Sequence, residues 1–87
     1  MMPIGLLKIL YRIGRNELPL QALPFQTIKD ALNEDVSFWI ESFGYISTRD
    51  LEDLMMAMTS IVEKYPTKNA RTILKTLCVA LEMRPSL

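Results

Sequence analysis

The amphipathic pattern of residues 47–65 constrains the fold of this chain more than any other feature. Its apolar residues recur at steps of three and four, the spacing of one face of an α-helix. They are Leu51, Leu54, Met55, Met58, Ile61, Val62 and Tyr65. Ser47 and Asp50 predict a capping box, in which the hydroxyl of Ser47 accepts a backbone N–H and the carboxylate of Asp50 reaches back. Because proline cannot continue a helix, Pro66 predicts the end, and we expect one long helix at the centre of the fold.

Helical patterns flank this central segment on both sides. Residues 4–13 place a stripe of leucine and isoleucine on one face, and Gly14 is predicted to be the C-cap residue. Thr67 is expected to cap a last helix that ends before Pro85. The corner at residues 65–67 is so short that the last two helices should pack antiparallel as neighbours.

The segment between the first helix and the central helix is predicted to fold in two parts. Residues 17–25 contain two prolines, so we expect at most one turn of helix, with the leucines and Phe25 packed over the core. Residues 25–43 carry a helical rhythm that breaks near Asn33, which allows one kinked helix or two short helices with Asn33 capping the second. Gly44 is predicted to be a C-cap. These patterns predict an all-α fold, a compact bundle of four or five short helices in a single domain spanning residues 1–87.

The composition excludes several functional classes. With 49% hydrophobic residues the chain is too apolar to be disordered, and no apolar run is long enough to span a bilayer. Histidine is absent, which removes the commonest metal ligand and the usual general base. The three glycines stand apart, so they form no phosphate-binding loop. We therefore predict no enzymatic activity, no cofactor and no bound metal.

Cysteine usage bears on the cellular compartment. Cys78 is the one cysteine, so no internal disulfide can form, and it lies on the predicted buried stripe of the last helix as a small packing residue. No signal-peptide pattern opens the chain. We expect the cytoplasm, with the nucleus as the alternative, and Met1 together with Pro85 leads us to expect a whole short protein.

Charge is unevenly distributed although the net charge is zero. Residues 1–29 carry four cations and one acid, a net charge of +3. Residues 30–53 carry seven acids and one cation, and residues 54–87 carry five cations and two acids, giving −6 and +3. One interpretation is that basic and acidic segments lie against one another within the fold. The other is that an acidic face of one copy meets a basic face of a second copy.

Three residues are predicted to contact a partner. Phe38 and Met56 fall outside the apolar stripes of their helices, where an aromatic ring or a flexible methionine can anchor an interface. Asp53 belongs to the acidic start of the central helix. A chain this short buries only about 60% of its unfolded surface, so a partner would add stability. We therefore predict a non-enzymatic protein–protein interaction module, a small adaptor, regulator or assembly domain, that acts by helix-face docking or as a homodimer.

A basic face on the last helix supports an alternative function. Lys68, Arg71 and Lys75 share this face, and together with Asn69 they follow a tight turn, as in a helix-turn-helix regulator that binds nucleic acid. The zero net charge and the proline in the turn count against this alternative. The first helix, whose second face is basic, has its own alternative as a segment that binds an anionic membrane surface or an acidic groove.

Overall fold

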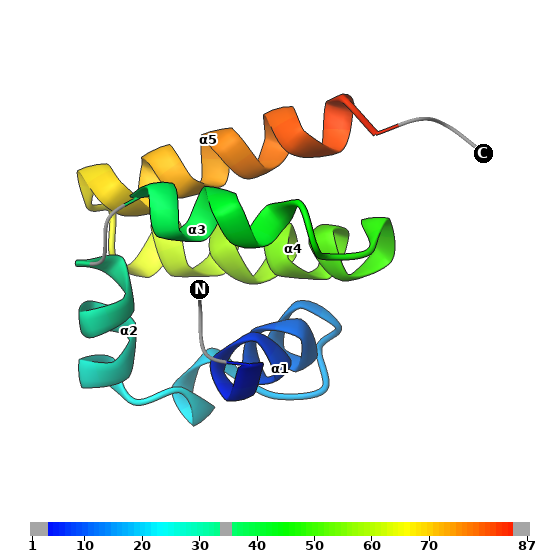
Figure 1. Ribbon diagram of the computed structural model, residues 1–87. Coiled ribbons are helices and arrows are strands. Elements are labelled where there is room, and N and C mark those ends of the chain that lie inside the picture. The colour runs from blue at the N-terminus through cyan, green and yellow to red at the C-terminus, as the bar shows by residue number, and fades with distance from the viewer. Residues whose placement is uncertain (1–3, 34–35, 85–87) are drawn as a thin grey trace.

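The computed structural model describes residues 4–33 and 36–84, and over these residues the regular secondary structure is helical, without strands (Figure 1). The elements, in chain order, are α1 (Ile4–Gly14), the 3₁₀ turn η1 (Leu20–Ala22), α2 (Phe25–Leu32), α3 (Val36–Phe43), α4 (Thr48–Lys64) and α5 (Lys68–Glu82). This confirms the predicted all-α bundle.

Helix α4 is the centre of the bundle, as its amphipathic pattern predicted. It packs mainly on α1 and α5, and Leu51, Leu54 and Met58 on its inner face are completely buried. The hydroxyl of Ser47 accepts the backbone N–H of Asp50 at 3.2 Å, so the predicted cap is present. The reciprocal half of the capping box is wrong, because the carboxylate of Asp50 binds Arg15 at 2.9 Å instead.

Helix α5 returns antiparallel beside α4, as the short corner predicted (Figure 1). The hydroxyl of Thr67 accepts the backbone N–H of Ala70 at 3.1 Å and so caps the helix. Ile73 and Leu77 are completely buried against α4. Cys78 differs from its prediction, since it is only partly buried at the margin of this stripe.

The end of α1 is built by Asn16 and not by the predicted C-cap Gly14. Asn16 has a φ of 63°, the left-handed conformation that closes a helix. Its N–H donates to the carbonyl of Ile13 at 3.1 Å, and the N–H of Glu17 donates to that of Arg12 at 2.8 Å, which is the Schellman pattern. Gly14 has no positive φ, so its backbone does not require glycine.

The segment between residues 25 and 43 forms two helices, which settles the open alternative. Asn33 is the C-cap of α2 with helical φ and ψ, so the prediction that it caps the following helix is wrong. Figure 1 shows α2 crossing one end of the layer formed by α3, α4 and α5. The indole N–H of Trp39 donates to the carbonyl of Ala31 at 3.1 Å and ties α3 to α2.

The connector before α2 is packed, with one exception. Its single 3₁₀ turn agrees with the prediction of at most one helical turn, and Leu23 is buried. Phe25 was predicted to pack over the core but is 56% exposed. It shares a face with Ile28 and Leu32, but it lies at the N-terminal end of α2, one turn beyond the last buried position.

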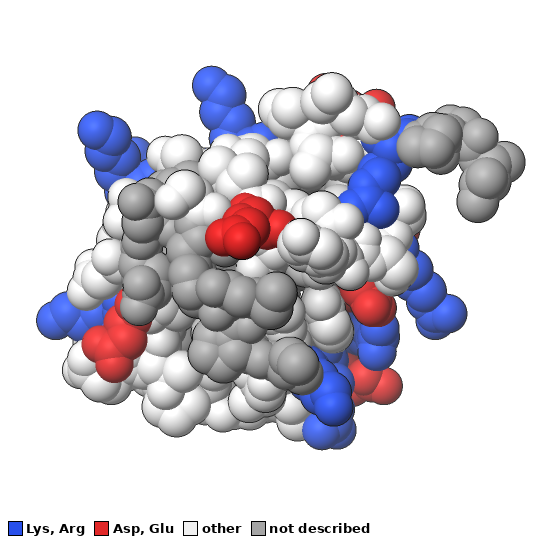
Figure 2. All heavy atoms as spheres, viewed as in Figure 1, with Lys and Arg blue, Asp and Glu red and all other residues white. Residues whose placement is uncertain are grey.

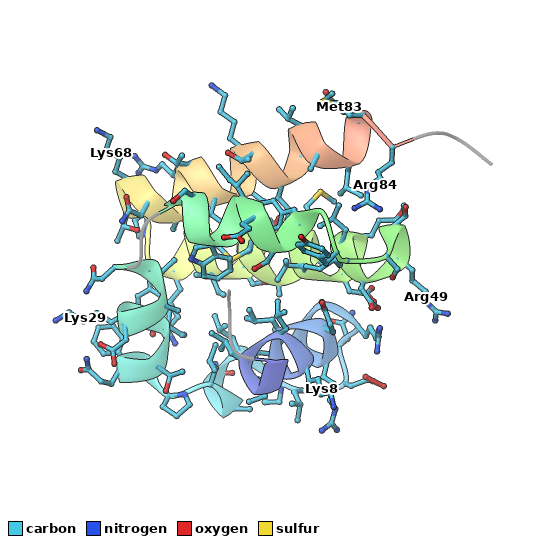
Figure 3. The ribbon with its side chains drawn as sticks, in the orientation of Figure 1. Lys8, Lys29, Arg49, Lys68, Met83 and Arg84 are labelled. Carbon is cyan, nitrogen blue, oxygen red and sulfur yellow. The ribbon has the colours of Figure 1, made fainter. Side chains whose placement is uncertain are left out.

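A distant arginine closes the C-terminal end of α3. Gly44 directly follows the last residue of α3, the position predicted for a C-cap, but its φ is not positive. The guanidinium of Arg84 instead donates from Nη2 to the carbonyls of Phe43 and Ile46, at 2.9 Å each (Figure 3). The carbonyl of Ile46 thereby gains a donor, and the carbonyl of Phe43, the last residue of α3, gains one beside the N–H of Ile46 at 3.4 Å.

The bundle has the dimensions of a compact domain. Its radius of gyration is 11.9 Å, against about 12 Å expected for a globular chain of this length. None of the helices in the two described segments combines the length and the apolar character needed to cross a membrane.

Candidate functional site

A groove of about 440 Å³ lies between α2 and the corner that joins α4 to α5. Its volume falls in the usual range of binding pockets, about 300–1,000 Å³. Nine described residues line it: Phe25, Ile28, Lys29, Leu32, Asn33, Tyr65, Thr67, Lys68 and Asn69. They come from segments that are more than thirty positions apart in the sequence, so tertiary packing creates the site.

The floor of the groove is apolar. Steps of three and four along α2 place Phe25, Ile28 and Leu32 on one face, and this face looks onto Tyr65 at the end of α4. The ring centroids of Phe25 and Tyr65 are 5.2 Å apart, with the planes tilted by 51°. This distance is typical of an attractive aromatic pair. Half of the Phe25 ring still faces solvent, which leaves apolar surface for a ligand to cover.

The rim of the groove is cationic. Lys29 and Lys68 are the charged members of the described lining, and both are exposed. Neither lysine takes part in an ion pair with any other described residue. Figure 3 shows both side chains leaving the same end of the molecule, and Figure 2 shows basic groups along that edge. Lys64, whose Nζ lies 5.9 Å from the centre of the Tyr65 ring, places a third cation beside the groove.

A partly buried amide links the two walls of the groove. The side-chain Nδ2 of Asn69, in the first turn of α5, donates to the backbone carbonyl of Leu32 at 2.8 Å. This bond satisfies a carbonyl at the end of α2 and couples the start of α5 to it. In the nucleic-acid alternative Asn69 was expected to contact the nucleic acid, but its amide is already hydrogen-bonded to Leu32 within the protein. The hydroxyls of Thr72 and Thr76 are also used, because each donates to a carbonyl one turn earlier at 2.9 Å.

The predicted basic face of α5 is present and continues into the groove. Lys68, Arg71 and Lys75 are all exposed. The fold adds Lys29, which the sequence analysis had not connected with them, because the C-terminal end of α2 lies beside the start of α5 (Figure 1). Phe25 and Tyr65 were likewise missed as site residues. Their only sequence signal is that each is an aromatic residue at a helix end beside a proline.

The three residues predicted to contact a partner are not brought together in one site. Met56 is 53% exposed on the outer surface of α4 and does not line the groove. The side chain of Phe38 lies outside the part of the chain that the structure describes. Asp53 is paired within its own chain, since its Oδ2 accepts a hydrogen bond from Nε of Arg15 at 2.6 Å.

The pairing of Arg15 with Asp50 and Asp53 links the basic start of the chain to its acidic middle. The hydrogen bond to Asp53 raises the pKa of the Arg15 guanidinium, so the arginine stays charged. Burial raises the pKa of the nearby Tyr11 phenol, and the negative charge of Asp50 adds to this effect. At this contact the interpretation that opposite charges meet within the fold is confirmed. Both carboxylates serve structure here, on α4 and away from the groove.

The groove therefore offers apolar surface and positive charge but no catalytic constellation. Its described lining contains no acid, cysteine or histidine that would act as a base or a metal ligand. Within residues 4–33 and 36–84 there is also no cluster of three or more such side chains suited to a metal ion. The described lining supplies apolar contact and attraction of negative charge.

Comparison with models of protein families, with curated proteins and with solved structures finds no match to this chain.

Proposed function

We propose that this chain is a non-enzymatic protein-interaction module, a small adaptor, regulator or assembly domain, and that it binds a helix of its partner in the groove beside α2. The observation that carries the proposal is the apolar floor of the groove, open to solvent at Phe25 and bordered by Lys29 and Lys68. An amphipathic helix that lays an apolar face into such a groove is a recurring mode of protein recognition.

The exposed ring of Phe25 supplies a source of binding energy. Aromatic side chains bury about 150–250 Å² when fully covered, and apolar burial contributes about 25 cal/mol per Å². Covering the exposed half of this ring would therefore contribute roughly 2 kcal/mol. Aromatic residues of this kind are frequent anchors of interfaces. The two lysines would orient an acidic partner and speed its association.

The test uses a designed peptide because the partner is not identified. A labelled helical peptide with leucines at helical steps of three and four and glutamates beside them is titrated with the protein, and binding is followed by fluorescence anisotropy. We expect the peptide to bind and Phe25→Ser to weaken binding by tenfold or more, since each tenfold corresponds to about 1.4 kcal/mol. Lys68→Glu should weaken it as well.

Tyr45→Ser is the matched control for this experiment. Tyr45 is 79% exposed, more than Phe25, but does not line the groove. Its substitution should leave peptide binding unchanged. Equal binding of a peptide with lysines in place of the glutamates, or equal loss in both serine variants, would contradict the proposed site.

The nucleic-acid alternative remains as a second candidate because Lys68, Arg71 and Lys75 form an exposed basic face. It is favoured less, because the amide of Asn69 and the hydroxyl of Thr72 are bonded within the protein. It predicts binding to labelled DNA or RNA that falls steeply with added salt and with Arg71→Ala. Arg71 does not line the groove, so this variant should leave peptide binding intact and thereby separate the two functions.

A further inference from the structure

We propose that the occupant of the groove is a second copy of this chain, which presents the outer face of α4 around Met56. This inference rests on the proposed function, in that it takes the groove to be a docking site. The α4 residues involved, here called the Met56 stripe, are Glu52, Met56, Thr59 and Glu63.

The Met56 stripe is one exposed face of a regular helix. Steps of four, three and four residues place its members in a row, about 16 Å long at 1.5 Å per residue. All four side chains are exposed, and the methionine is 53% exposed. In the part of the chain that the structure describes, neither Glu52 nor Glu63 takes part in an ion pair. The stripe is therefore an apolar anchor between two uncompensated acids.

The groove has the complementary pattern. Phe25 and Tyr65 form an apolar aromatic floor, and Lys29 and Lys68 stand on either wall without an acidic partner among the described residues. A methionine sulfur packs favourably against aromatic rings, and its flexible chain adapts to an irregular groove. The acids before and after Met56 would then face the two lysines. Charge complementarity and apolar fit thus select the same stripe.

The cations of α4 are compatible with this charge complementarity between stripe and groove. Arg49 precedes Glu52 by one turn and so lies beyond the end of the stripe, at the end of the molecule away from Lys29 and Lys68 (Figure 3). Lys64 is directed to the ring of Tyr65, beside the groove of its own copy. The acids Asp50 and Asp53 are neutralised by Arg15, so the exposed Glu52 and Glu63 are the carboxylates of α4 that are left for a partner.

No residue of the Met56 stripe lines the groove, so the contact joins two different surfaces. A pair joined by one such contact has one free groove and one free stripe, and further copies extend it into a ring or an open chain. Because both charged pairs are at the surface, salt should weaken it. A symmetric dimer through two grooves would bring like charges together and is disfavoured by the same lysines.

The first experiment measures the solution mass by light scattering behind a sizing column, over a range of protein concentrations and at two salt concentrations. We expect the native chain to exceed the monomer mass as concentration rises, and added salt to lower the mass. Met56→Ser and Glu52→Lys should each weaken association tenfold or more. Met83→Ser is the matched control. Met83 is 80% exposed at the C-cap of α5, and its substitution should leave association unchanged.

The decisive experiment mixes two defective copies. Phe25→Ser keeps the stripe and loses the groove, whereas Met56→Ser keeps the groove and loses the stripe. Each alone should be monomeric, and an equal mixture should form a heterodimer that grows no further, because its two remaining faces are defective. Circular dichroism of each variant confirms that the helices are intact, as expected for substitutions at exposed positions.

Three outcomes would overturn the inference. A monomer at every concentration and salt level rules out a second copy as the occupant, but the designed peptide still tests the groove itself. Association that survives Met56→Ser and is lost in Met83→Ser assigns the contact to α5. A mixture of the two defective copies that stays monomeric excludes the pairing of groove and stripe.

Discussion

Asn16 turns the chain at the end of α1. Its φ of 63° is left-handed, and it is the only positive φ among the described non-glycine residues. Asparagine tolerates this region better than most residues, which fits it to the position that closes a Schellman pattern. Gly14, two residues earlier, has a different reason to be glycine. A Cβ atom at Gly14 would collide with the backbone carbonyl of Asp53, so its missing side chain lets α1 approach α4 closely.

This assignment predicts opposite results for two substitutions near the end of α1. Gly14→Ala should lower the free energy of unfolding by about 2 kcal/mol, since overpacking against backbone forces the helices apart. Asn16→Gly should change it by less than about 0.5 kcal/mol, because glycine adopts a positive φ readily. Chemical unfolding followed by the fluorescence of buried Trp39 measures both. Equal stability of the two variants, or the reverse order, would contradict the close approach of α1 to α4 at Gly14.

Helix α3 depends on neighbouring elements for its stability. It has only eight residues, too few to be stable alone in water. Trp39 anchors it to α2 through a bond to Ala31, and Arg84 reaches from the end of α5 to bond the carbonyls of Phe43 and Ile46. The short helix is thus held near its middle by α2 and at its C-terminal end by Arg84, which is distant in sequence.

Arg84→Ala should therefore destabilise the fold by about 1–2 kcal/mol, because the partly buried carbonyls of Phe43 and Ile46 lose the guanidinium donor. In a domain of this size such a loss lowers the melting temperature by roughly 5–15 °C. Arg84→Lys should recover only part of it, since an ammonium lacks the planar fork of donors. Arg71→Ala removes the same charge from an exposed site on α5 and should leave the melting temperature nearly unchanged. Equal effects of the two alanine variants would contradict the closing role of Arg84.

Across the whole molecule, the segregated charges are used in two ways. Part of the acidic middle pairs internally, where Arg15 binds Asp50 at 2.9 Å and Asp53 at 2.6 Å. The remaining charges, such as Lys29 and Lys68 on the groove and Glu52 on the Met56 stripe, face solvent. The internal pairs hold α1 on α4, and the exposed charges are those on which the proposed contact between copies depends.

Charge reversal at Arg15 and at Arg12 distinguishes the effect of specific ion pairs on stability from the effect of net charge. Arg15→Glu places an acid against Asp50 and Asp53, and we expect it to lower the melting temperature clearly. Arg12→Glu makes the same change of net charge at an exposed position with no ion pair among the described residues, so its effect should be small. Thermal unfolding at low salt measures both, and added salt should narrow the difference. Similar melting temperatures would mean that the Arg15 pairs do not contribute.

Much of the fold could be predicted from local sequence because it depends on short-range periodicity and caps. The steps of three and four in residues 47–65 predicted α4, and Ser47 and Thr67 predicted the starts of α4 and α5. Where a local signal competed with a distant contact, the distant contact prevailed. The carboxylate of Asp50 accepts from Arg15 and does not complete the capping box. Gly14 packs closely on the backbone of Asp53 and is not the cap of α1.

The candidate site could be predicted only in part. The exposure of Met56 and of the basic face of α5 follows from helical spacing, because it concerns one helix at a time. The groove required Phe25, Lys29, Tyr65 and Lys68 to meet, and no periodicity specifies how α2 lies across the corner between α4 and α5. Helix packing sets that crossing through the burial of Trp39 and the bond from Asn69 to Leu32. Local physics thus specified the helices, whereas long-range packing decided which of their faces form a site.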